Sequence, residues 1–82
     1  MSTLENLIRM ANQIARNLET HGPEAAAAAT ADHIRKFWAP RMRAAVQDHI
    51  ERECGRGLSE IALQAFRQIG LASGAAHDTP NA

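Results

Sequence analysis

The stretch that decides the fold is LENLIRMANQIARNL, residues 4–18, because its apolar side chains recur at steps of three and four residues. This spacing places them on one stripe of an α-helix. Ser2 and Glu5 match a capping box at the helix start, and His21-Gly22-Pro23 predicts its end and the start of a second helix. The stripe consists of Leu4, Leu7, Ile8, Ala11, Ile14, Ala15 and Leu18.

The second helix is predicted from about Pro23 to Phe37, and it contains an alanine run of high helix propensity. Its apolar stripe continues to the end of the segment. Pro40 disfavours helical geometry at Ala39, so a break is expected there. The stripe consists of Thr30, Ala31, Ile34, Phe37 and Trp38.

Two further helices complete the prediction. The third runs from about Pro40 to Glu53, and glycines at positions 55 and 57 end it. The fourth begins after Ser59, a favourable N-cap, and is predicted to stop at Gly70. We therefore predict an all-α fold, a small bundle of three to four short helices over residues 1–70, with a flexible, disordered tail over residues 71–82.

Composition narrows the function. The 82 residues carry nine basic and nine acidic side chains, so no global field attracts nucleic acid or a membrane surface. Charges interrupt the N-terminal apolar pattern and no apolar run is long enough for a bilayer, which favours a soluble, cytoplasmic protein. Seventeen residues are alanine, which buries little surface, so the core is expected to be thin. We hypothesise that a partner or self-association supplies the missing burial.

No catalytic, cofactor-binding or metal-binding residues are predicted. The histidines at positions 21, 33, 49 and 77 and the single Cys54 lack the short spacings of zinc ligands. Asp48 and His49 are adjacent on a helix and point in different directions, so they form no catalytic pair. The chain is therefore expected not to be an enzyme by itself.

The stretch HIRKFWAPRMR, residues 33–43, is the candidate binding region. It holds four basic residues and two aromatic residues without an acid, and these types are enriched at protein interfaces. The alternative is that the aromatic rings fill the core while the cations face solvent. The predicted partner-binding residues are Arg35, Lys36, Phe37, Trp38, Pro40, Arg41, Met42 and Arg43.

A second interpretation is a helix-turn-helix nucleic-acid-binding module, with Arg41 and Arg43 opening the recognition helix. The zero net charge and the acids that follow in the same helix, from Asp48 to Glu53, argue against it. A self-associating helical protein is the remaining alternative.

The segments Leu7–Ile14 and Asp32–Arg43, with the Gly57-Leu58-Ser59 turn, resemble the delta subunit of soluble NAD-dependent formate dehydrogenases. The resemblance covers about residues 4–70, and its most specific part is Lys-Phe-Trp-x-Pro-Arg-Met, residues 36–42. Ala39 departs from the pattern, since many relatives carry Asp there. The loss of that N-cap is expected to cost about 1 kcal/mol.

The resemblance implies a non-catalytic accessory subunit of a complex that oxidises formate and reduces NAD. The expected partner is the catalytic alpha subunit, with bis-molybdopterin guanine dinucleotide carrying molybdenum or tungsten, and iron–sulfur clusters. Beta and gamma subunits are expected in the complex, with FMN and the NAD site on the beta subunit. The implied role is to support complex stability or insertion of the molybdenum cofactor. We expect docking to bury Phe37 and Trp38, with the nearby cations at the rim.

Overall fold

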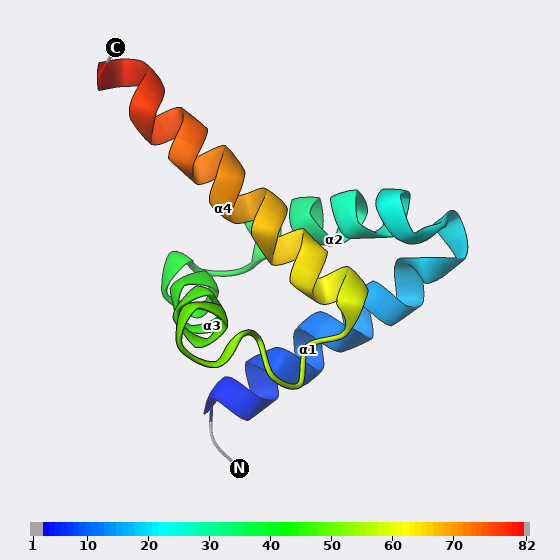
Figure 1. Cartoon of the computed structure of the whole chain (residues 1–82). Helices are drawn as coiled ribbons and strands as arrows, with labels where there is room; N and C mark the ends of the chain where they lie inside the picture. Colours follow the sequence, from blue (N-terminus) through cyan, green and yellow to red (C-terminus); the bar gives the residue numbers. More distant parts are fainter. Residues whose placement is uncertain (1–2, 82) are drawn as a thin grey trace.

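The computed structural model describes the backbone of residues 3–81 and the side chains of residues 3–70. Four α-helices and one short 3-10 helix make up this part of the chain, and it contains no strand (Figure 1). The predicted all-α bundle is confirmed. The elements are α1 (Thr3–Leu18), η1 (Glu19–His21), α2 (Pro23–Phe37), α3 (Pro40–Glu53) and α4 (Glu60–Asn81).

The junction between α1 and α2 follows the predicted pattern. Gly22 adopts φ 95°, a region that favours glycine, and Pro23 occupies the first turn of α2, where its missing N–H costs nothing. Ser2, half of the predicted capping box, lies outside the described residues.

The break between α2 and α3 falls at Trp38 and Ala39, whose backbones are extended with ψ 140° and 149°. Pro40 is the first residue of α3, as predicted. Ala39 provides no side-chain cap, but its carbonyl oxygen accepts hydrogen bonds from the amides of Met42 at 2.9 Å and Arg43 at 3.2 Å. The backbone therefore closes the first turn of α3 without a capping side chain.

The loop between α3 and α4 turns through left-handed backbone, with Cys54 at φ 60° and Gly55 at φ 74°. A Cβ on Gly55 would lie 2.9 Å from Leu63 Cδ1, so a side chain at this buried position would have to displace the end of Leu63 as well as adopt a left-handed backbone. Ser59 caps α4 as predicted, because its Oγ accepts a hydrogen bond from the Ala62 amide at 3.2 Å.

Two side chains from other elements tie this loop to the bundle. Asn12 on α1 donates from Nδ2 to the Gly57 carbonyl at 2.8 Å and accepts the Ser59 amide on Oδ1 at 2.8 Å. His49 on α3 is buried, and its Nε2 donates to the Arg56 carbonyl at 2.7 Å. The loop thus has fixed attachments to both α1 and α3.

The fourth helix is longer than the sequence analysis predicted, since α4 continues past Gly70 to Asn81. A glycine inside a helix costs only about 1 kcal/mol relative to alanine, so it is a weaker stop than proline. The predicted flexible tail, residues 71–82, lies outside the residues whose side chains are described, and it stays a prediction.

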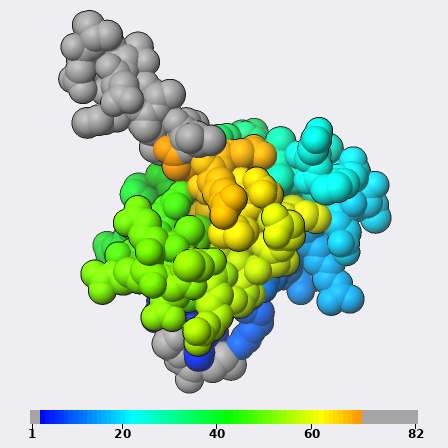
Figure 2. All heavy atoms as spheres, viewed as in Figure 1, coloured from blue at the N-terminus to red at the C-terminus, as the bar shows by residue number. Residues whose placement is uncertain are grey.

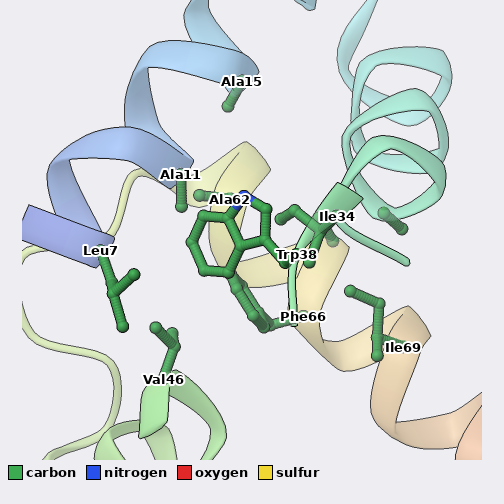
Figure 3. Close-up of a cluster of buried hydrophobic side chains, with 11 residues drawn as sticks. Leu7, Ala11, Ala15, Ile34, Trp38, Val46, Ala62, Phe66 and Ile69 are labelled. Carbon is green, nitrogen blue, oxygen red and sulfur yellow. The ribbon is translucent and has the colours of Figure 1, made fainter. Parts of the chain in front are cut away.

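The core gathers where α4 crosses α2 and reaches α1 (Figures 1 and 3). Seven of the thirteen buried hydrophobic residues are alanines, so the core is as thin as predicted and the helices approach closely. The larger members surround the indole ring of Trp38, which packs edge-on against Phe66 with 5.9 Å between ring centroids. The residues around the ring are Leu7, Ile34, Val46, Phe66 and Ile69.

Seen from outside, α3 and the first turns of α4 form one continuous surface with α2 beside them (Figure 2). Among the residues that the structure describes, no helix combines the length and apolar character needed to cross a bilayer.

Replacing Asn12 by Ala removes both ties between α1 and the α3–α4 loop. We expect the free energy of unfolding to fall by about 1–2 kcal/mol, because two backbone groups lose their partner. Urea denaturation followed by far-UV circular dichroism measures this. Asn17→Ala is the matched control, since the Asn17 side chain bonds only to Gln13 on its own helix among the described residues. Equal effects of the two changes would contradict the assignment.

Thr30 on α2 is fully buried, and its Oγ1 has no hydrogen-bond partner among the described residues. A buried hydroxyl without a partner costs about 1–3 kcal/mol. Thr30→Val keeps the shape and removes the hydroxyl, so we expect the free energy of unfolding to rise by about 1 kcal/mol. Thr20→Val at the exposed 3-10 turn should change stability by less than about 0.5 kcal/mol. A destabilised Thr30→Val variant would show that the hydroxyl has a partner.

Candidate partner-binding surface

The predicted binding stretch lies at the corner between α2 and α3, but its side chains do not share one face. Five of its residues are exposed, two are half-buried and one is buried. The exposed members are Arg35, Lys36, Phe37, Pro40 and Arg41; Met42 and Arg43 are half-buried, and Trp38 is buried.

Trp38 belongs to the core and not to the surface. Only 6% of it is exposed, and its ring lies between α1, α2 and α4 (Figure 3). The bundle itself therefore accounts for the burial of Trp38, and its predicted contact with a partner stays a prediction. The reason for this burial is the position of Trp38 four residues after Ile34, on the same face of the helix, so that the apolar stripe of α2 carries the indole inward.

Phe37 takes the opposite position. It is 71% exposed and is the most exposed large hydrophobic residue among residues 3–70. Its ring lies 4.8 Å from that of His33, one turn earlier, at an angle of 43° between the planes. This contact holds the phenyl ring along the side of α2, where it remains accessible.

Phe37 stands at an open groove of about 380 Å³ between α1, α2 and α3. The lining is predominantly apolar and carries no carboxylate. Met10 contributes from α1 and is 44% exposed. The sequence analysis did not select this residue, because it lies beside the apolar stripe of α1. We call this feature the corner groove; its residues are Met10, Gln13, Ile14, His33, Phe37, Trp38 and Met42.

The cations of the stretch lie on different sides of the corner. Arg43 and Pro40 line a second groove of about 340 Å³ with Ile69 of α4. Lys36 pairs with Asp32 at 3.0 Å, and both side chains are more than half exposed, so the pair contributes at most about 1 kcal/mol. Within residues 3–70, Arg35, Arg41 and Arg43 form no ion pair.

A third groove, about 570 Å³, lies between α1 and the start of α4 and is walled by Arg16, Glu19 and Glu60. Its mixed charges distinguish it from the apolar corner groove. In the part of the chain with described side chains, no three His, Cys, Asp or Glu residues are placed to hold a metal ion. Cys54 is exposed and unpaired with another cysteine.

By its described residues, the chain is a small helical bundle whose most distinctive surface feature is an apolar groove. The family model for the NADH-dependent formate dehydrogenase delta subunit, FdsD, matches residues 6–66. The chain belongs to this family, as the resemblance predicted, and every residue of the corner groove lies within the matched range. The family name denotes a subunit of a multi-subunit formate dehydrogenase. No curated protein and no solved structure matches the chain.

The neighbours Phe37 and Trp38 permit a direct test of the core assignment. Trp38→Ala should lower the free energy of unfolding by about 3–5 kcal/mol, because it leaves a cavity at the centre of three helices. Phe37→Ala should change it by less than about 0.5 kcal/mol, as for other exposed positions. Urea denaturation of both variants measures the difference. Similar losses in the two variants would contradict the assignment.

Proposed function

We propose that this chain is a non-catalytic delta subunit that docks on the catalytic alpha subunit of a cytoplasmic formate dehydrogenase through the corner groove. Docking supports stability of the complex, and through it retention or insertion of the molybdenum cofactor. The observation that carries the proposal is the exposed Phe37 at an apolar groove inside the family-matched segment.

The exposure of Phe37 is what calls for a partner. A phenylalanine side chain in water forgoes about 1.5–3 kcal/mol that burial would provide. Beside it, Met10 and Met42 offer flexible thioether side chains that adapt to a partner's shape. Aromatic residues and methionine are enriched in interface cores, and a few such residues carry most of the binding energy.

A non-catalytic role agrees with the ligand chemistry of the chain. An iron–sulfur cluster is usually ligated by four cysteine thiolates, and this sequence has one cysteine. The single cysteine supports placing the iron–sulfur clusters on other subunits, and the proposal places bis-molybdopterin guanine dinucleotide, FMN and NAD there as well.

The arginines of α3 favour docking over direct guidance of the cofactor. Arg41 and Arg43 are two residues apart, which turns their side chains roughly 200° around the helix axis. Arg43 lines a groove on the other side of the corner. Such a pair does not converge on one phosphate group, whereas each cation can meet a different group at an interface.

Phe37→Ala in the co-expressed complex should release this subunit from the alpha subunit. Loss of a central aromatic anchor costs about 2 kcal/mol or more, which is about thirtyfold in affinity. Size-exclusion chromatography of the purified complex measures the retained fraction. Phe37→Leu should retain most binding because it keeps an apolar side chain, and Arg67→Ala on exposed α4 should retain all of it.

Retention of the Phe37→Ala subunit at the wild-type level would refute docking through this groove. Molybdenum content of the same preparations separates the two supporting roles. Normal assembly with molybdenum-deficient enzyme after charge reversal at Arg41 and Arg43 would favour cofactor guidance. Lost assembly with that variant would favour docking.

A further inference from the structure

We infer that the corner groove receives an amphipathic helix of the alpha subunit, with apolar side chains on one face and carboxylates at the edges of that face. This inference rests on the proposed docking to the alpha subunit and specifies the segment that fills the groove.

A cation precedes each of three apolar residues of the groove, one on each helix: Arg9 before Met10, Lys36 before Phe37 and Arg41 before Met42. Consecutive helix residues are about 100° apart, so each cation stands beside its apolar neighbour and not behind it. All three cations are exposed. By the same step the exposed Asp32 stands beside His33, so the neighbours of these lining residues are three cations and one acid. We call the three cations the basic edge.

Within this edge, Lys36 pairs with Asp32 through a 3.0 Å contact. The pair is solvent-exposed and lies within one helix, and such pairs are worth about 0.3–0.5 kcal/mol. A carboxylate from a partner can therefore replace Asp32 at little cost. Acidic side chains flanking the occupant's apolar face complement the groove, and basic ones oppose it.

The walls of the groove determine the occupant's secondary structure. They are formed by α1, α2 and α3, whose backbone groups are bonded within their own helices. The described residues contain no strand edge to which an extended peptide could add. A segment entering this apolar groove must satisfy its own amides and carbonyls, and a helix does so.

The spacing of the lining residues suits a helix as well. Met10 and Ile14 are one turn apart on α1, a separation of roughly 6 Å along the axis. An occupant with apolar residues at positions i, i+3 or i+4, and i+7 presents side chains at similar intervals. Phe37 and Met42 complete the lining from α2 and α3.

A second copy of this chain fits the groove poorly. In a two-fold dimer the same patch faces itself, so the three cations of one copy would meet those of the other. Like charges placed together across an interface cost binding energy. The lining itself holds no carboxylate, and Asp32 beside it is already paired with Lys36 of its own copy.

Photo-crosslinking identifies the occupant directly. Phe37 is replaced by p-benzoylphenylalanine in the co-expressed complex, and irradiation followed by mass spectrometry locates the bonded residue. We expect the bond to fall in one alpha-subunit segment with apolar residues at helical spacing and Asp or Glu at its flanks. A bond to a second copy of this chain, to another subunit or to a segment without flanking acids would overturn the inference.

Charge reversal tests the basic edge. Lys36→Glu with Arg41→Glu should speed dissociation from the alpha subunit about tenfold or more, equivalent to one unit of log affinity. Added NaCl should weaken the wild-type complex but have little effect on this variant. Arg56→Glu with Arg67→Glu makes the same change in net charge at exposed positions outside the groove, and dissociation should change by less than about twofold.

Equal effects of the two double variants would overturn the inference, because only net charge would then matter. Reversing the flanking acids of the crosslinked segment to Lys should restore binding of the Lys36→Glu, Arg41→Glu variant. The docking proposal itself fails separately, if the wild-type subunit is not retained by the alpha subunit at all. Circular dichroism of each variant confirms that the bundle remains folded.

Discussion

The packing of the Trp38 indole ring is the constraint on which the rest of this small bundle depends. The ring lies between α1, α2 and α4 and meets Phe66 edge-on, in a core made mostly of alanines. It reaches this place because Trp38 follows Ile34 by one helical turn and its amide still donates to the Ile34 carbonyl at 2.9 Å. The chain then becomes extended at Trp38 and Ala39 before Pro40 starts a new helix. The corner is therefore both the break between two helices and the point at which the largest side chain fills the interior.

The same corner presents Phe37 to solvent, so core and surface are coupled at two consecutive residues. Trp38 forms part of the corner groove while remaining 94% buried, since only 6% of it is exposed. A partner bound in the groove would contact the Trp38 indole ring. The other contacts of that ring lie within the core of the bundle. The position of the groove is thus set by the core and not by flexible surface side chains.

Much of the fold could be predicted from the sequence because its strongest signals are local. Pro23 and Pro40 each stand at the first position of a helix, and Ser59 caps another. The end of α4 was less predictable, since glycine only weakens a helix. The ties from Asn12 and His49 to the α3–α4 loop join residues distant in sequence, and no periodic pattern reports them.

The candidate site was only partly predictable. The binding stretch was found by composition, but composition does not tell which of two adjacent aromatic residues faces inward. That difference follows from the 100° step of the helix and from the extended backbone at Trp38. Met10 was missed because it lies outside the apolar stripe of α1, and its proximity to Phe37 arises only when the helices pack.

The alanines between α2 and α4 have a further consequence. Ala31 on α2 and Ala62 and Ala65 on α4 belong to one buried cluster, and their small methyl groups let these two helices approach closely. A larger residue at any of these sites must push α2 and α4 apart, and Phe66 moves with α4. Phe66 packs against the indole ring of Trp38, and Trp38 lines the corner groove. Such a displacement would therefore change the shape of the groove. The shape of the corner groove is thereby linked to positions that do not line it.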